Sequence, residues 1–222
     1  MEGKVTIKIK QHEAFIFDMD GLLIDTERIC WECFRKACSE FSYEPDFEIY
    51  KKCIGRKPEE GNLILKQGFD PFIPFDDVHS KWNEFYRNYV DNEIIPLKPG
   101  VRFVLNLLYR NDTRLAVATS TNRELALRKL TRTGLIGFFD LVVSGDQIEH
   151  SKPDPEIYLT VAKQLNVKPE KCVAFEDSDS GVRSAFSAGM RTIQIIDLIY
   201  PAEEVRKLKH TIIKSFNNIL FE

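Results

Sequence analysis

The chain lacks the features by which membrane and secreted proteins are commonly recognised. It has no long apolar run: stretches such as IQIIDLIY are short and interrupted, whereas a membrane helix needs about 18 consecutive apolar residues. The first ten residues, MEGKVTIKIK, alternate apolar and charged residues and do not present the continuous apolar segment of a signal peptide. We therefore expect a cytoplasmic protein that does not contact a membrane.

Neither sign of charge dominates the sequence. Its 222 residues include 31 Lys and Arg against 34 Asp and Glu, which gives a formal net charge of −3. Nucleic-acid-binding proteins usually carry an excess of Lys and Arg, so we expect no nucleic-acid partner. A content of 43% hydrophobic and 29% charged residues is typical of a globular protein and excludes a disordered or fibrous chain.

Cysteine is also scarce. The five cysteines are odd in number and too few for the disulfide framework of a secreted protein. Cys30 and Cys33 have the CxxC spacing of zinc sites, but a structural zinc site needs four ligands, and no second pair of Cys or His follows. We expect these two residues, three apart on a helix, to be small core-facing side chains.

The apolar segments that are present predict an α/β fold. Each short apolar run is followed by a turn and then by a segment with helical spacing, a pattern typical of a parallel sheet with helices on both faces. The predicted strands are residues 14–17, 114–118, 141–143, 172–175 and 192–196, and the predicted helices are residues 101–110, 123–132, 155–165 and 180–188. The segment VTIKIK could be an extra edge strand or could be disordered.

The distance between the first two predicted strands indicates an insertion, because almost 100 residues are far more than a crossover needs. The inserted segment reads as helices, with Gly21 before it and Pro96, Pro99 and Gly100 after it as residues typical of turns and stiff linkers. The sequence thus predicts a Rossmann-like core of residues 1–26 and 96–222 and a helical cap domain of residues 27–95. Limited proteolysis is expected to cut near residues 21–25 or 96–100.

The first predicted strand ends in FDMDG, which places Asp18 and Asp20 at its carboxyl end. Because the two residues are two positions apart on a strand, their side chains point to the same face of the sheet. Ligands of open α/β sheets bind outside the carboxyl ends of the strands. Taken alone, however, such a pair is equally typical of a solvated turn.

Thr119 and Ser120 follow the second strand and precede a helix, whose amino end offers N–H and hydroxyl donors to an anion. An ordinary helix N-cap by Thr121 or Asn122 is the alternative interpretation. Lys152, in SKPDP after the third strand, is either a ligand for a phosphate oxygen or a surface lysine.

Glu176 and Asp177 end the fourth strand and offer the oxygen ligands that Mg²⁺ prefers, although Asp177 or Ser178 could instead cap the next helix. If the strand order is 3-2-1-4-5, the first and fourth strands flank the binding crevice and their carboxylates face each other. Such carboxylates repel one another unless a cation lies between them, so the pattern predicts bound Mg²⁺.

Four segments, FDMDGLLIDTE, VATST, SKPDPEIY and VAFEDSDSGVRSAFSAGM, resemble the motifs of the haloacid dehalogenase superfamily. The chain is most similar to the subfamily with a helical cap after the first motif, which contains phosphoglycolate and sugar phosphatases, pseudouridine 5′-phosphatase-like enzymes and β-phosphoglucomutases. The resemblance implies that Asp18 attacks phosphorus and forms an aspartyl-phosphate, while Asp20 acts first as acid and then as base. It implies Mg²⁺ ligands at Asp18, Asp20 (backbone carbonyl), Glu176 and Asp177, and phosphate contacts from Thr119, Ser120 and Lys152.

The function expected from this resemblance is hydrolysis of a small phosphate monoester, such as a sugar phosphate, a nucleotide or nucleoside phosphate, or a phosphoglycolate-type compound, by a monomer. A sugar phosphomutase is the closest alternative, because Ile54-Gly55-Arg56 resembles a cap loop whose Arg grips a second phosphate. Mutases of the family typically carry a His near the position of Cys30, and its absence favours hydrolysis. Arg56 could contact the substrate or be a solvated surface residue.

A non-enzymatic module is the remaining alternative. Phospho-receiver domains also gather Asp, Thr and Lys around Mg²⁺, but they are shorter, lack a cap and accept phosphate after the third strand. An inactive binding protein on the same fold would not need every catalytic position to be filled, as it is here.

Overall fold

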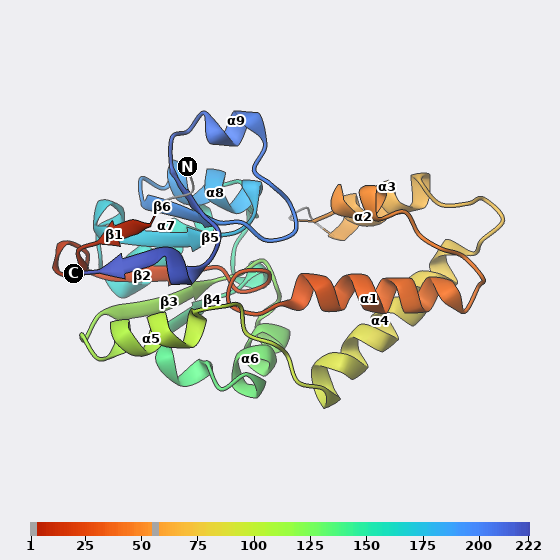
Figure 1. Cartoon of the computed structure of the whole chain (residues 1–222), viewed down its shortest axis with the longest axis horizontal. Coiled ribbons are helices and arrows are strands. Elements are labelled where there is room, and N and C mark those ends of the chain that lie inside the picture. The colour runs from red at the N-terminus through yellow and green to blue at the C-terminus, as the bar shows by residue number, and fades with distance from the viewer. Residues whose placement is uncertain (1–3, 55–57) are drawn as a thin grey trace. The chain divides into compact units, whose positions relative to one another are not determined.

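The computed structural model describes residues 4–54 and 58–222, and its elements form two compact units (Figure 1). One unit comprises Met1–Ile24 and Pro96–Glu222, and the other comprises Asp25–Ile95. The helical unit interrupts the α/β unit after its first sheet strand, as the insertion predicted. Whether the two units correspond to domains that divide at residues 26–27 and 95–96 stays a prediction.

The α/β unit is built on a six-stranded parallel sheet. Its order is β4-β3-β2-β5-β6-β7, which is the predicted 3-2-1-4-5 order with one further strand at the edge. The strands are β2 (Ala14–Phe17), β3 (Arg114–Ala118), β4 (Leu141–Val143), β5 (Cys172–Glu176), β6 (Arg191–Ile195) and β7 (Thr211–Ile213). The first five match the prediction within one residue at each end. Strand β7 was missed: a 3-10 turn and not a helix follows it, so the pattern of apolar run, turn and helix does not mark it.

The central strands are apolar throughout because both faces of the sheet are covered. All four residues of β2 are buried. One face carries small side chains such as Ala14, Ala116 and Ala174, which pack in a cluster with Tyr158. The other face carries aromatic rings, among them Phe17 and Phe175, whose centroids lie 4.9 Å apart. This alternation of small and large side chains fixes which helices fit on each face.

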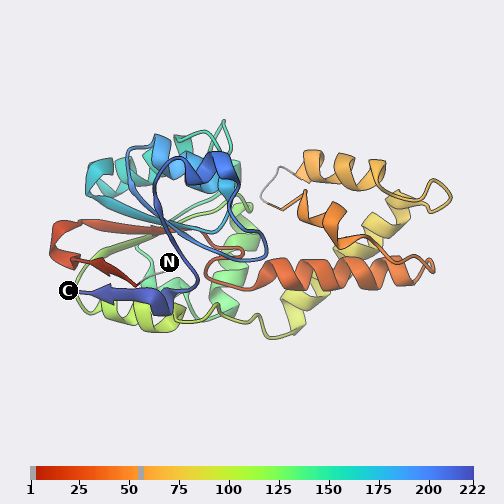
Figure 2. The same ribbon diagram turned by 45° about the horizontal axis from the view of Figure 1, so that its top comes forward.

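Helices cover both faces of this sheet (Figures 1 and 2). Helices α7 (Glu156–Leu165) and α8 (Asp179–Ser187) lie on one face, and α5 (Val101–Tyr109) and α6 (Arg123–Arg132) lie on the other. Asn122 caps α6 by accepting a hydrogen bond from the Leu125 N–H, and Ser178 caps α8 by accepting one from the Gly181 N–H. Because these residues are the caps, the side chains of Thr121 and Asp177 are left for other partners.

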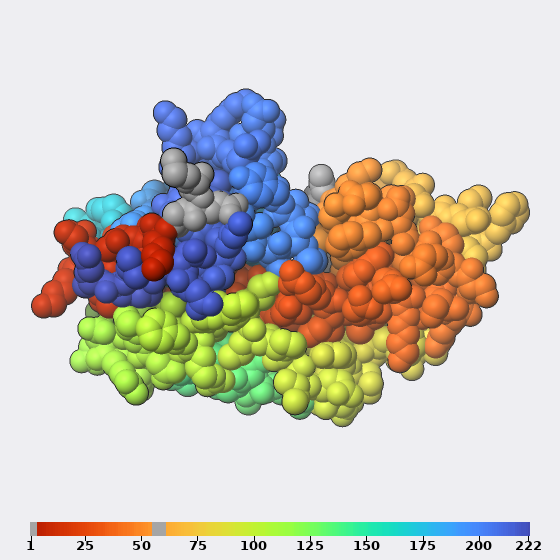
Figure 3. All heavy atoms as spheres, viewed as in Figure 1, coloured from red at the N-terminus to blue at the C-terminus, as the bar shows by residue number. Residues whose placement is uncertain are grey.

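The segment VTIKIK contains an extra strand, as the first of the two alternatives predicted, but this strand does not join the six-stranded sheet. Val5–Ile7 forms strand β1, which pairs in parallel with β8 (Ile219–Phe221) as a separate two-stranded sheet. A 3-10 turn, η1 (Ile9–Gln11), follows β1. Figure 3 shows the atoms of the two terminal segments together on one face. The pairing joins residues more than 200 positions apart, which no local pattern can predict.

The helical unit contains α1 (Thr26–Ser39), α2 (Phe47–Lys51), α3 (Pro58–Gln67) and α4 (Phe75–Asn92). Its core is aromatic: the rings of Phe34 and Trp82 lie 4.9 Å apart, and the Trp82 indole N–H donates to the Cys30 carbonyl at 3.0 Å. The aromatic side chains of these helices therefore pack in the core of this unit. Cys33 is buried and Cys30 is half-buried, and no disulfide joins them.

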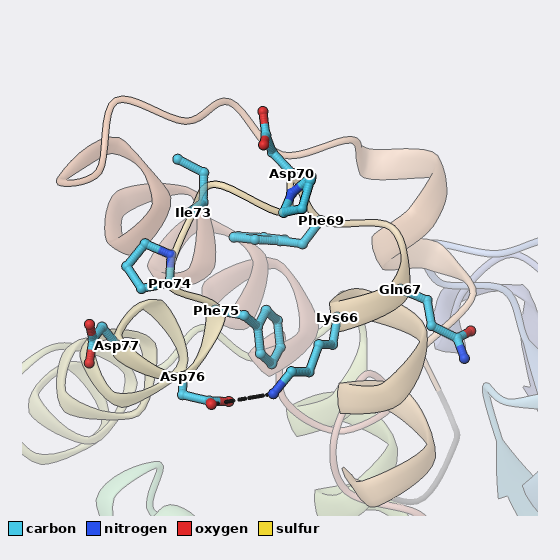
Figure 4. Close-up of a pocket in the computed structure, with 10 residues that line it drawn as sticks. Lys66, Gln67, Phe69, Asp70, Ile73, Pro74, Phe75, Asp76 and Asp77 are labelled. Carbon is cyan, nitrogen blue, oxygen red and sulfur yellow. Dashed lines mark hydrogen bonds and ion pairs between the residues drawn. The ribbon is translucent and has the colours of Figure 1, made fainter.

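A hollow of about 650 Å³ lies in the helical unit between the end of α3 and the start of α4 (Figure 4). Phe69 and Phe75 line it, and the Lys66 ammonium pairs with the Asp76 carboxylate at 3.1 Å. The groups that line it form no cluster of metal-ligating side chains among the described residues. Among residues 4–54 and 58–222, no helix is long and apolar enough to cross a membrane.

Candidate active site

The strand register brings the ends of β2, β3 and β5 to one edge of the sheet. Phe17, the last residue of β2, pairs with Val117 on one side and with Phe175 on the other. Asp18, which follows β2, donates its backbone N–H to the Phe175 carbonyl at 3.0 Å. The polar residues that follow these three strands are therefore neighbours in space, as the sequence predicted.

Lys152 lies at the centre of this edge. Its ammonium donates to Asp18 Oδ1 at 2.5 Å, to Glu176 Oε1 at 2.6 Å and to the Ala118 carbonyl at 3.0 Å. All three charged side chains are buried, and a buried lysine is rare unless it is paired. Although burial lowers the pKa of Lys152, the carboxylates of Asp18 and Glu176 outweigh burial and raise that pKa above its usual value. Lys152 is therefore a charged site residue and not a surface lysine.

The carboxyl group of Asp18 has a strongly raised pKa. Burial raises its pKa from 3.8 to about 7, the Lys152 ammonium opposes this rise, and the nearby charges of Glu176 and Asp20 add to it. At neutral pH the metal-free carboxyl group is thus shared between its protonated and ionised forms. Further positive charge at this edge would favour the ionised form of Asp18.

The acidic residues at this edge fit a divalent cation. Asp18, Glu176 and Asp177 each offer a carboxylate oxygen within 4.8 Å of the others. Such oxygens suit Mg²⁺. The missing side chain of Gly21 leaves the space that the Asp177 carboxylate occupies, because a Cβ there would collide with it. Lys152 pairs with two of these three carboxylates, those of Asp18 and Glu176.

Glu176 is already engaged in several hydrogen bonds. Its Oε1 accepts from Lys152 and from the Tyr158 hydroxyl, each at 2.6 Å, and its Oε2 accepts from the backbone N–H of Asp177 at 3.2 Å. Gly181 on α8 passes so close that an added Cβ would overlap this carboxyl group. Glu176 is therefore rigidly held, and its clearest role in the geometry is to orient Lys152.

Thr119 and Ser120 follow β3 at the same edge. Thr119 is buried, and its Oγ1 accepts from the Thr121 N–H at 3.1 Å, which leaves its own hydroxyl proton available to an incoming acceptor. Ser120 is exposed, and its carbonyl is packed so tightly against Gly145 that a Cβ there would overlap it. The loop between β3 and α6 is thereby fixed by the segment that follows β4.

Two partners of Asp20 were not expected from the sequence. The Thr121 hydroxyl donates to Asp20 Oδ2 at 2.6 Å, and the Lys129 ammonium donates to Asp20 Oδ1 at 2.7 Å. Lys129 lies on the buried face of α6 with Ala126 and Leu130. A lysine at an apolar position of a helix is a signal that could have identified it.

Tyr158 on α7 is a third residue that the sequence did not indicate. It is fully buried, it donates its hydroxyl proton to Glu176, and its ring centroid lies 5.4 Å from the Lys152 ammonium. Burial raises its phenol pKa well above the usual value, so the group stays a proton donor. Arg56, the predicted cap residue, lies outside the described residues.

Comparison with known proteins agrees with this geometry. The profile of haloacid dehalogenase-like hydrolases matches residues 15–195. A phosphorylated carbohydrates phosphatase from Thermotoga maritima is 40% identical over 181 residues, which are 82% of this chain and 83% of that protein.

Solved structures are similar as well. A Thermotoga maritima protein assigned as a β-phosphoglucomutase is 34% identical with a TM-score of 0.76, over 92% of this chain and 97% of that one. A CbbY mutant from Rhodobacter sphaeroides, solved with xylulose-(1,5)-bisphosphate, is 28% identical with a TM-score of 0.71, over 92% of this chain and 95% of that one. Since the family profile covers most of the sequence, the chain belongs to the haloacid dehalogenase-like hydrolases and is an enzyme of the phosphatase kind.

Proposed function

We propose that this enzyme is a Mg²⁺-dependent phosphatase that hydrolyses small phosphate monoesters, with phosphorylated sugars as its substrate class, through an aspartyl-phosphate on Asp18. The observation that carries the proposal is the buried bridge from Asp18 through Lys152 to Glu176, beside Asp177. The substrate class is supported by the Thermotoga maritima phosphatase of phosphorylated carbohydrates and by the sugar bisphosphate bound to CbbY.

In the first step, a carboxylate oxygen of Asp18 attacks phosphorus while the bond from phosphorus to the ester oxygen breaks. The carboxylic acid of Asp20 gives its proton to the leaving oxygen, which departs as an alcohol. In the second step, ionised Asp20 takes a proton from water and the resulting hydroxide attacks phosphorus. The phosphorus–Asp18 bond breaks, inorganic phosphate leaves, and Asp20 is again protonated. One difficult displacement becomes two easier ones.

The surrounding residues stabilise negative charge on the transferring group. Asp18, Asp177 and the backbone carbonyl of Asp20 would hold Mg²⁺, which when bound neutralises charge between two anions. Lys152 and the Thr119 hydroxyl, with the Ser120 N–H, would donate to the phosphoryl oxygens. Glu176 belongs to the same acidic group and contributes through its hold on Lys152.

The decisive experiment is a screen of phosphate monoesters with Mg²⁺, read as released phosphate. We expect turnover of at least one sugar phosphate, loss of turnover with EDTA, and a fall of about 10⁴-fold or more in Asp18→Asn, because removal of a nucleophile leaves little catalysis. Thermal unfolding of the variant serves as the control for folding. Full Mg²⁺-dependent turnover by Asp18→Asn would rule out the aspartyl-phosphate.

A sugar phosphomutase is the second candidate, favoured by the 34% identity to the protein assigned as a β-phosphoglucomutase. The presence of Cys30, where the mutases carry a His nearby, favours hydrolysis instead. Incubation with β-glucose 1-phosphate and a catalytic amount of the 1,6-bisphosphate separates the two. A phosphatase releases phosphate, whereas a mutase forms glucose 6-phosphate.

A further inference from the structure

The carboxylate of Asp20 is held at both of its oxygens by residues of the loop after β3 and of helix α6. Thr121 Oγ1 lies 2.6 Å from Oδ2 and Lys129 Nζ lies 2.7 Å from Oδ1. The Lys129 side chain is 3% exposed and the Asp20 side chain 19% exposed. On the same helix, the neighbouring pair of Arg128 and Glu124 is 38% and 83% exposed. The chain therefore buries one of two adjacent basic residues of α6 beside Asp20.

Stability gives a weak reason for this arrangement. Moving an ammonium group out of water costs several kcal/mol, and well-packed apolar side chains often replace buried ion pairs without loss of stability. The position of Lys129 between Ala126 and Leu130 on the buried face would accommodate an apolar residue by the pattern of the helix. What an apolar side chain cannot do is hold the Asp20 carboxyl group in one orientation.

We propose that Lys129 and Thr121 are positioning residues that fix the Asp20 carboxyl group for proton transfer to the leaving oxygen. This inference rests on the proposed function, in which Asp20 is the acid of the first step. Thr121 donates to Oδ2, and a carboxyl oxygen that carries a proton can still accept such a bond, so the acid proton stays available to the leaving oxygen. Lys129 donates to the other oxygen and prevents rotation of the group. Precise placement of an acid is worth a large part of its catalytic effect.

A positioned acid affects only the breaking of the bond between phosphorus and the leaving oxygen, so substrates with different leaving groups can test the positioning role. Phenyl phosphate leaves as a phenoxide that needs a proton, whereas p-nitrophenyl phosphate has nearly the same shape and leaves readily without one. In Lys129→Met we expect kcat/KM for phenyl phosphate to fall about 10- to 100-fold, since general acid catalysis contributes about 10²- to 10⁴-fold in total. For p-nitrophenyl phosphate we expect a fall of less than about 3-fold, because that step uses the acid little.

Matched variants separate positioning from packing. Arg128→Met removes the exposed neighbour of Lys129 and should leave kcat/KM unchanged for both phosphate esters. Thr121→Val removes the hydroxyl group at nearly constant shape. It should steepen the leaving-group dependence, which means that kcat/KM falls more for phenyl phosphate than for p-nitrophenyl phosphate. Thr121→Ser keeps the hydroxyl group and should not change this dependence. If Lys129→Met does not fold, as thermal unfolding would reveal, the comparison of Thr121→Val with Thr121→Ser decides the question by itself.

Asp20→Asn separates the proposed acid role of Asp20 from the positioning role of Lys129 and Thr121. If this variant steepens the leaving-group dependence and neither Lys129→Met nor Thr121→Val does, Asp20 is the acid and the positioning role is wrong. Equal losses on both substrates in the Lys129 and Thr121 variants also overturn positioning, because a purely structural defect affects all substrates alike. If Asp20→Asn itself leaves the dependence unchanged, the proposed acid role fails.

Discussion

At the scale of single residues, the site contains a conflict between burial and charge at Asp18. Its carboxyl group is buried next to other carboxylates, and this burial raises its pKa from 3.8 to about 7 even though Lys152 lies 2.5 Å away. A solvated aspartate would be ionised at neutral pH without assistance. Burial of this proposed nucleophile makes its ionised form depend on positive charge supplied at the site, and it costs stability in the metal-free protein.

The pH dependence of stability tests this conflict. Between about pH 4 and 7, native Asp18 retains a proton that the unfolded chain has released, so its contribution to the free energy of unfolding falls as pH rises through this window. In EDTA, wild type should lose stability relative to Asp18→Asn from pH 4 to pH 7, by about 1.4 kcal/mol per pH unit at most. Urea unfolding of both proteins measures the difference. Parallel curves would show that burial does not perturb Asp18.

At the scale of elements, the turn after β2 places backbone where side chains cannot fit. Gly21 has φ of +81° and donates its N–H to the Ile24 carbonyl at 2.9 Å. A Cβ there would overlap the Asp177 carboxylate and touch that of Asp197. Gly189, after α8, has nearly the same φ of +79°, but a Cβ there would meet nothing within 4 Å. The two glycines therefore share a left-handed backbone conformation, which would strain any other residue, and differ in their neighbours.

Comparing Gly21→Ala with Gly189→Ala isolates the contact with Asp177. Both variants should lose about 1 kcal/mol of stability from the left-handed backbone. Gly21→Ala should in addition displace the Asp177 carboxylate and raise the Mg²⁺ concentration needed for half-maximal phosphatase activity about 10- to 100-fold. Thermal unfolding and a Mg²⁺ titration of each variant measure the two effects. An unchanged Mg²⁺ requirement in Gly21→Ala would argue against Asp177 as a ligand.

At the scale of the whole molecule, the two connections between the compact units differ. Leu22, Leu23 and Ile24 are fully buried, and the Lys98 N–H donates to the Leu23 carbonyl at 3.0 Å. The first connection is therefore part of the α/β unit and not the exposed linker that Gly21 suggested. In the second connection Ile94 is exposed, whereas Lys98 pairs with Asp197 at 2.5 Å.

Limited digestion with proteinase K should reflect this difference. We expect early cuts at residues 93–96 and in the loop of the helical unit at residues 70–72, where Phe72 is 92% exposed. Residues 21–24 should resist, because cleavage requires the backbone to leave its buried, hydrogen-bonded place. Mass spectrometry of the fragments identifies the sites. Early cutting at 21–24 would contradict the burial of the first connection.

The sequence by itself determined the order of the main elements and much of the candidate site. Apolar runs and helical spacing are local patterns, and parallel strands bring their carboxyl ends to one edge of a sheet. These two facts are enough to group Asp18, Thr119, Lys152 and Asp177 at that edge. Their individual roles stay proposals.

The tertiary structure decided what depends on contacts between distant segments. It brought Lys129 and Tyr158 from the inner faces of two helices to Asp20 and Glu176, and it paired β1 with β8. It also showed that Lys152 is buried between two carboxylates and that Asp18 has a raised pKa. Burial and electrostatic fields are sums over neighbours in space, and a linear pattern does not contain them.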